Sequence, residues 1–218
     1  MSYQIKFING EVFKSPLGKV VCVGRNYAEH AKELNNPIPT EPILFIKPES
    51  SVVSMDDAFT IPESDCHYET EIAVLIGGTL CKATEQLASE SIVGLGLALD
   101  LTKRSLQSKL KEKGHPWEKA KSFDGACPLS NFVPRSEFSD LGSLRFTLDI
   151  NGERKQDGNS ADMLTPIIPL LVHISQHFTL KPGDIVLTGT PKGVGELFKG
   201  DKLLLNLMDK LVLETLTA

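Results

Sequence analysis

The stretch YETEIAVLI at residues 68–76 decides how this chain folds, together with VGLGLALD at residues 93–100. Both stretches are apolar enough to form buried strands. The first also carries Glu69 and Glu71, and the second ends in Asp100. Alternate side chains of a strand lie on one face, so Glu69 and Glu71 project the same way. The pattern predicts three carboxylates in a chelating arrangement.

Three carboxylates that lie together repel one another unless a cation neutralises them or one of them takes up a proton. A hard divalent ion with oxygen ligands removes this repulsion and fixes the geometry. We therefore predict that Glu69, Glu71 and Asp100 bind a magnesium-type ion. Manganese suits the same all-oxygen site.

Length and composition favour one compact domain spanning residues 1–218. The chain has 218 residues, of which 41% are hydrophobic, and a formal net charge of -5 without an acidic or basic block. Nucleic acid is not an expected partner, because that function needs a concentrated basic surface. The basic run at residues 103–113 is interpreted mainly as a solvated helix face.

The location expected from the sequence is the cytoplasm, without a membrane partner. No stretch has the length and apolarity of a membrane span, and the first residues lack the pattern of a signal peptide. The four cysteines form no C-x-x-C pair, so a zinc ribbon or a redox motif is not indicated.

Strands dominate the predicted fold, which belongs to the α+β class. Strands are expected at residues 19–23, 43–47, 68–76, 93–99, 184–188, 202–208 and 211–216. Two hairpins are expected, at residues 3–13 and from residue 144 onward, each turning at an Asn-Gly pair. Helices are expected at residues 26–35, 84–91 and 102–113, with a longer one ending near Phe178. Asn26 is expected to cap the first helix, and Glu29 to complete a capping box.

His30 and Glu33 occupy positions i and i+3 of the first predicted helix, so they face the same side. Glu33 can orient the imidazole, and such a pair can take a proton from water. The alternative is an ordinary surface histidine on an exposed helix.

Two lysines are further candidates for a site. Lys121 lies in an irregular segment flanked by aromatic residues, and such segments often line sites, although a single lysine is more often solvated. Lys47 ends an apolar strand, where its charge points either into a cleft or into water.

The loop TGTPKGVG at residues 188–195 has glycines that allow the backbone to approach an anion, and threonines that can donate to a carboxylate. It lacks the Gly-Lys-Ser/Thr order of a phosphate-binding loop. His173 and His177 have the spacing of two zinc ligands, but the adjacent glutamate of a zinc protease is missing, so helix packing is the preferred interpretation.

These motifs together resemble the fumarylacetoacetate hydrolase family, in particular its single-domain acylpyruvase and oxaloacetate decarboxylase-like branch. The resemblance is carried by GRNY at residues 24–27, LTGTPKGVG at residues 187–195, and by His30, Glu33, Glu69, Glu71, Asp100 and Lys121. It implies a mixed β-roll with a few short peripheral helices, a homodimer, and a Mg²⁺ or Mn²⁺ ion on the three carboxylates. It also implies that Lys121 supports the metal site and that a lid carries His30 and Glu33. Relatives often have Asp after the residue equivalent to Arg104, whereas Ser105 stands here.

The activity expected from this resemblance is hydrolysis of an acylpyruvate, a small 2-oxo acid. His30, oriented by Glu33, would take a proton from the water that attacks the distal carbonyl. Cleavage of the carbon-carbon bond would leave a pyruvate enolate stabilised by the metal and Lys121. The candidates for holding substrate oxygens are Arg25, Lys47, Gln107 and Thr190.

Other activities stay open. Oxaloacetate decarboxylation would pass through the same enolate, and keto-enol exchange of oxaloacetate needs only the chelate and one acid-base group. Hydratases and isomerases of the family share the metal trio. A non-catalytic metabolite-binding dimer with this fold is the alternative outside enzymes.

Overall fold

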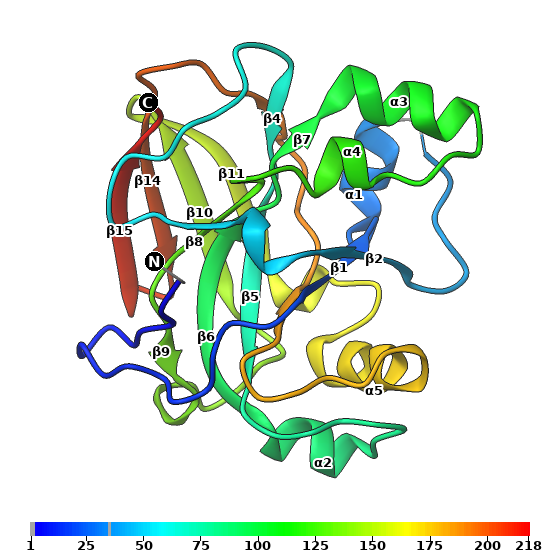
Figure 1. Ribbon diagram of the computed structural model, residues 1–218, viewed down its shortest axis with the longest axis vertical. Coiled ribbons are helices and arrows are strands. Elements are labelled where there is room, and N and C mark those ends of the chain that lie inside the picture. The colour runs from blue at the N-terminus through cyan, green and yellow to red at the C-terminus, as the bar shows by residue number, and fades with distance from the viewer. Residues whose placement is uncertain (1–2, 35) are drawn as a thin grey trace.

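The computed structural model describes residues 3–34 and 36–218, which form three sheets with short helices around them (Figure 1). The main sheet has the order β2-β1-β12-β5-β6-β8-β3, and β9 also pairs with β6. It is mixed, because β1 and β12 are parallel, as are β3 and β8, whereas the other pairs are antiparallel. Its strands are β1 (Val20–Gly24), β2 (Ile43–Lys47), β3 (Val52–Ser54), β5 (Thr70–Ile76), β6 (Ile92–Leu99), β8 (Cys127–Leu129), β9 (Val133–Pro134) and β12 (Ile185–Leu187).

A second, antiparallel sheet has the order β11-β10-β14-β15, and a small third sheet has the order β13-β4-β7. Their strands are β10 (Arg145–Ile150), β11 (Glu153–Asn159), β14 (Lys202–Leu207), β15 (Leu211–Leu216), β4 (Cys66–Tyr68), β7 (Thr102–Lys103) and β13 (Gly195–Glu196). The α-helices are α1 (Ala28–Glu33), α2 (Glu85–Glu90), α3 (Arg104–Glu112), α4 (Glu118–Lys121) and α5 (Ile167–His177). The prediction of a strand-dominated α+β fold with a few short peripheral helices is confirmed.

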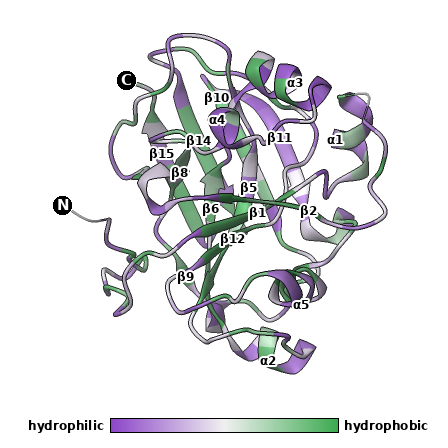
Figure 2. Ribbon diagram, turned by 45° about the vertical axis from the view of Figure 1, so that its right-hand side comes forward, coloured by the Kyte–Doolittle hydropathy of each residue, from purple (hydrophilic) through white to green (hydrophobic). Residues whose placement is uncertain are grey.

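Strand β5 lies at the centre of the main sheet and is buried along its whole length. Ile72, Val74 and Ile76 enter an apolar cluster that also contains residues of β10, β14 and α5. Ala73 and Leu75 enter a second cluster on the opposite face. Since both faces are covered, β5 is continuously apolar from Ile72 to Ile76, and the central strands of the molecule are largely hydrophobic in Figure 2.

The pairing of β5 with β6 places the acidic residues. Glu71 pairs with Ala98, and the N–H of Asp100 donates to the backbone oxygen of Glu69 at 2.8 Å. Directly opposed residues of two strands share a face, so Asp100 and Glu69 project together. Glu71 shares that face because it is two residues from Glu69.

Several boundaries differ from those expected. The predicted strand at residues 68–76 divides at Glu69, because β4 pairs with β13 and β7 in the small sheet whereas β5 belongs to the main sheet. The hairpin at residues 3–13 is reduced to one bridge between Lys6 and Val12. Part of this segment bonds elsewhere, since Phe7 forms a bridge with Phe132. The second hairpin is confirmed, with Asn151 and Gly152 at φ 53° and 83° between β10 and β11.

The predicted cap of the first helix is wrong. Tyr27 is the N-cap residue, without a side-chain hydrogen bond, and α1 is shorter than expected. The Asn26 amide instead bonds the backbone of Thr165 and Thr188, at 2.8–3.0 Å. These distant partners use both polar atoms of the amide. The predicted end of this helix, Asn35, lies outside the described residues. Within the described residues, no helix is long and apolar enough to cross a membrane.

Candidate functional site

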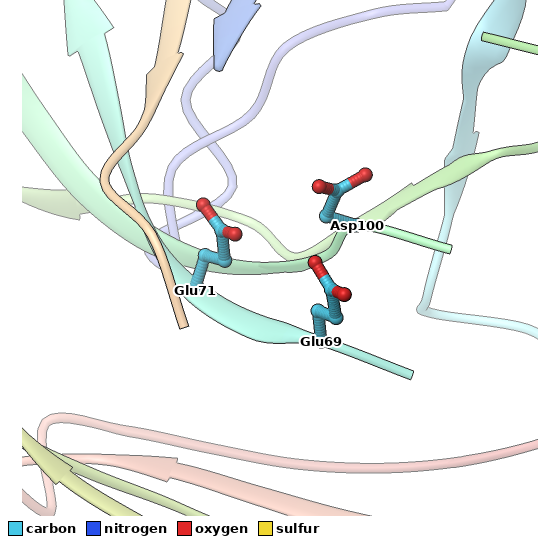
Figure 3. Close-up of side chains that lie close together, drawn as sticks. All are labelled: Glu69, Glu71 and Asp100. Carbon is cyan, nitrogen blue, oxygen red and sulfur yellow. The ribbon is translucent and has the colours of Figure 1, made fainter. Parts of the chain in front are cut away.

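Glu69, Glu71 and Asp100 gather at one end of β5 and β6 (Figure 3). One carboxylate oxygen from each lies within 4.8 Å of the others, and the three residues are 6%, 1% and 1% exposed. In residues 3–34 and 36–218 no other group of three or more His, Cys, Asp and Glu side chains has such spacing. His173 and His177 lie together on α5 with ring centroids 4.9 Å apart, outside this cluster.

Three buried or half-buried cations surround the carboxylates. Lys121 Nζ lies 2.8 Å from Glu69 Oε2 and 2.6 Å from Asp100 Oδ2. Arg104 forms an ion pair with the other oxygen of Glu69. Lys47 Nζ lies 2.7 Å from Asp100 Oδ1, in a direction that makes no hydrogen bond with that oxygen. Glu69 and Asp100 therefore each contact two cations.

Glu71 differs from its neighbours because it has no ion-pair partner in the described part of the chain. Its Oε2 accepts a hydrogen bond from the N–H of Gly189 at 2.6 Å. Burial, followed by the charges of Asp100 and Glu69, raises the pKa of Glu71 well above its usual range. Burial also acts to raise the pKa of Glu69, but Lys121 and Arg104 outweigh it and lower that pKa. The pKa values of Glu71 and Glu69 are therefore shifted in opposite directions, upward for Glu71 and downward for Glu69.

The cluster fits a divalent metal ion. Its donors are all oxygen atoms, which hard cations prefer, and a cation would relieve the repulsion that raises the pKa of Glu71. Asp100 Oδ1 also has no hydrogen bond of its own. Lys121 is held in its charged form, since Asp100 and Glu69 overcome the effect of burial and raise its pKa to about 12.

A cavity of about 110 Å³ opens beside the carboxylates. Its wall is built from the ends of β1 and β5, from α1, α3 and α4, and from the loop that follows β12. Figure 1 shows α1, α3 and α4 together on one side of the main sheet. Predicted site residues that line the cavity are Arg25, His30, Glu69, Glu71, Asp100, Gln107, Lys121 and Thr190.

His30 is 5% exposed and faces the cavity from α1, so the alternative of an exposed surface histidine is wrong. Its Nδ1 lies 3.4 Å from Glu33 Oε2, as the i, i+3 spacing predicts. Glu33 also accepts hydrogen bonds from the N–H of Gly193 at 3.0 and 3.2 Å. This contact joins α1 to the loop at residues 188–195.

Lys47 and Thr190 are placed differently from what their expected roles require. Lys47 is fully buried and donates to the backbone oxygens of Lys121 and Ala126, so it lies behind Asp100 and not on the cavity wall. Thr190 reaches the wall, but its hydroxyl donates to the backbone oxygen of Thr70 at 2.8 Å. The glycine-rich loop does approach an anion, which is the protein's own Glu71.

The family model described as fumarylacetoacetate (FAA) hydrolase C-terminal matches residues 19–217. The chain belongs to the fumarylacetoacetate hydrolase family. Oxaloacetate tautomerase YcgM of Escherichia coli (strain K12) is 50% identical over 204 residues, which cover 92% of this chain and 93% of the relative. The mitochondrial oxaloacetate tautomerase FAHD1 of Bos taurus is 40% identical over 186 residues, which cover 84% of each chain.

A solved structure of a fumarylpyruvate hydrolase has the same fold. The crystal structure of fumarylpyruvate hydrolase from Pseudomonas aeruginosa, in complex with Mn²⁺ and pyruvate, matches with a TM-score of 0.92 at 31% identity. The match covers all of this chain and 96% of that chain. Together with the acidic cluster, this complex supports a divalent metal at the site.

Sequence reasoning predicted Gln107 at the site but missed its neighbours on the cavity-facing side of α3. Arg104, Ser108 and Lys111 line the cavity together with Gln107, so the interpretation of this run as mainly a solvated face is wrong for that side of the helix. The available signal was their i, i+3, i+4, i+7 spacing, which places them on one helix face. Ser105, the position at which the resemblance leads one to expect Asp, is not among the residues that line the cavity.

Ser105 fixes the start of α3 through Asp65. Its N–H and its hydroxyl donate to the two carboxylate oxygens of Asp65 at 2.7 and 3.0 Å. The adjacent Arg104 is left to contact Glu69 and to donate to Gln107 Oε1 at 2.9 Å. These contacts account for how Arg104 and Gln107 are held beside the cluster.

Proposed function

We propose that this protein catalyses the keto-enol exchange of oxaloacetate, with Mg²⁺ or Mn²⁺ bound by Glu69, Glu71 and Asp100. The observation that carries the proposal is the sharing of one small cavity by an all-oxygen cluster and His30. The two relatives named above, oxaloacetate tautomerases of Escherichia coli and Bos taurus, support the choice of reaction. Keto-enol exchange moves one proton between carbon and oxygen and breaks no carbon-carbon bond.

A divalent ion at the cluster, when bound, would chelate the 2-oxo carboxylate and make the neighbouring C–H group more acidic. His30 removes the proton from C3 of the keto form and delivers a proton to the enolate oxygen, which gives the enol; the reverse reaction runs the same two transfers backward. Glu33 keeps the imidazole oriented toward the cavity from 3.4 Å. Lys121 remains protonated because of its raised pKa, so it contributes positive charge and a hydrogen bond to the enolate oxygen.

Acylpyruvate hydrolysis is the second candidate, and it is the activity expected first from the sequence. The contact between His30 and Glu33 favours it, because this pair is suited to taking a proton from an attacking water molecule. The similarity to a fumarylpyruvate hydrolase also supports it. Oxaloacetate decarboxylation would need the same enolate stabilisation without the water.

The deciding experiment follows the ultraviolet enol band of oxaloacetate with Mg²⁺, with Mn²⁺ and with a chelator. A coupled lactate dehydrogenase assay for pyruvate runs in parallel, on oxaloacetate, acetylpyruvate and fumarylpyruvate. Metal-dependent approach to keto-enol equilibrium, much faster than pyruvate formation, is expected. Faster pyruvate release than enol exchange would favour hydrolysis or decarboxylation, and binding without turnover would favour a metabolite-binding dimer.

The variant His30→Ala tests the acid-base group. Loss of such a group generally lowers turnover by ~10²–10⁴-fold, and magnesium affinity should be retained because His30 is not among the predicted ligands. Full exchange activity in this variant would remove His30 from the mechanism. The homodimer and the cytoplasmic location stay predictions, and light scattering on the purified protein checks the first.

A further inference from the structure

Besides Lys121, which is paired with Glu69 and Asp100, three cationic side chains line the cavity. Arg104 and Lys111 lie one above the other on α3, and Arg25 reaches the cavity from the loop after β1. Arg104 is neutralised by its ion pair with Glu69. The positive charges of Arg25 and Lys111 have no such acidic partner among the described residues.

Neither Arg25 nor Lys111 forms an ion pair with any residue that the structure describes. Lys111 Nζ donates to the neutral side-chain oxygen of Asn36 at 2.8 Å. Arg104, Lys47 and Lys121 equal the three metal-cluster carboxylates in number, so the charges of Arg25 and Lys111 are in surplus. A bound divalent cation would increase this surplus.

The two surplus cations are close enough to affect each other. Burial, followed by the charges of Arg25 and Arg104, lowers the pKa of Lys111. Both side chains are half-buried, and burial also lowers the pKa of Arg25. Half-buried like charges without a counter-ion are unfavourable, and an anion between them would be stabilised by charge-assisted hydrogen bonds.

We propose that Arg25 and Lys111 form a subsite for the second carboxylate of a dianionic 2-oxo acid. The inference rests on the proposed function for the position of the first carboxylate, which is the metal cluster. Oxaloacetate carries a carboxylate at each end, whereas acetylpyruvate has only the chelating one. The subsite therefore selects short 2-oxo dicarboxylates over monoanionic acylpyruvates, and it gives the cationic side of α3 a role in specificity.

The test compares two ligands by calorimetry on the magnesium-loaded protein. Oxalate has the chelating end without a chain beyond it, and 3,3-difluoro-oxaloacetate has both ends but no C3 proton to exchange. Lys111→Gln is expected to weaken the difluoro ligand about tenfold and to leave oxalate within about twofold, because only the former loses a charge-assisted hydrogen bond. Arg25→Gln should act in the same direction.

The matched control is Lys109→Gln, which removes the same charge from an exposed position of α3 outside the cavity wall. It should bind both ligands as the unchanged protein does. Lys111→Arg retains the charge and should restore most of the affinity for the difluoro ligand. In kinetics, Lys111→Gln should raise KM for oxaloacetate more than it lowers kcat.

Two results would overturn the subsite: equal weakening of both ligands by Lys111→Gln, or no weakening of either. The experiments distinguish a failure of the proposed subsite from a failure of the proposed reaction. If the unchanged protein does not accelerate enol exchange but its binding of the difluoro ligand depends on Lys111, the subsite is supported and the proposed reaction is wrong. If exchange is accelerated and binding is independent of Lys111, the subsite is wrong and the reaction is supported.

Discussion

Replacing Lys47 by methionine should destabilise the metal-free protein by about 3 kcal/mol, the lower end of the usual cost of breaking a buried ion pair. Lys47 is fully buried and lies 2.7 Å from Asp100 Oδ1. Methionine fills similar space but removes the charge and the donors to two backbone oxygens, those of Lys121 and Ala126. The lower end applies because Lys121 still contacts Asp100 at 2.6 Å.

Magnesium should reverse part of this loss. A bound cation would place positive charge beside Asp100, and removal of the Lys47 charge lessens the repulsion that the cation meets. We expect Lys47→Met to bind Mg²⁺ about tenfold more tightly, which corresponds to about 1.4 kcal/mol. Saturating Mg²⁺ should narrow the stability gap between the two proteins by about this amount, because ligand binding to the folded state adds to its stability.

The assay is urea unfolding followed by circular dichroism, in a chelator and in saturating Mg²⁺. Lys19→Met is the matched control, because Lys19 pairs with Asp184 and lines no part of the cavity. Its stability loss should be the same in both conditions. A gap for Lys47→Met that magnesium leaves unchanged, or a gap below about 1 kcal/mol in chelator, would refute the assignment of Lys47 to the charge balance of the cluster.

Four further predictions concern Glu71 and the residues that support it. Since the pKa of Glu71 is raised, the carboxyl of Glu71 in the metal-free protein holds a proton at any pH below that pKa. Magnesium must displace this proton, so magnesium affinity should fall as the pH falls through the raised pKa. Calorimetry in buffers of different ionisation enthalpy should detect the released proton. For the same reason, the contribution of Glu71 to metal-free stability should decline as the pH rises from the ordinary glutamate pKa to the raised one. Gln156→Leu should cost about 1–3 kcal/mol in urea unfolding and weaken magnesium binding, because the Gln156 amide accepts from Thr70 N, between the two glutamates, at 3.0 Å. Gly189→Ala should lower the melting temperature and the magnesium affinity. The reason is that φ of Gly189 is 92° and an added Cβ would lie 2.7 Å from Cβ of Asn26. An unchanged melting temperature and magnesium affinity would show that the loop adapts to the added methyl group.

Local patterns predicted much of the fold. The strands at residues 43–47 and 211–216 match β2 and β15, and the Asn-Gly turn at 151–152 lies where expected. These features depend on a two-residue alternation or on the φ angles of one turn, which neighbouring residues determine. The short helix α4 was missed because four residues are too few to show helical periodicity.

The sequence by itself determined that Glu69 and Glu71 share a face, and that His30 and Glu33 lie side by side, because strand and helix periods relate residues two to four positions apart. Only the tertiary structure decided which groups meet them. Lys121 reaches Glu69 across 52 residues of sequence, and Gly189 reaches Glu71 across 118. Tertiary packing also decided that Lys47 is buried behind Asp100 and that one side of α3 faces the cavity. Such contacts follow from strand order and register, which depend on how the whole chain packs its apolar faces and not on any local repeat.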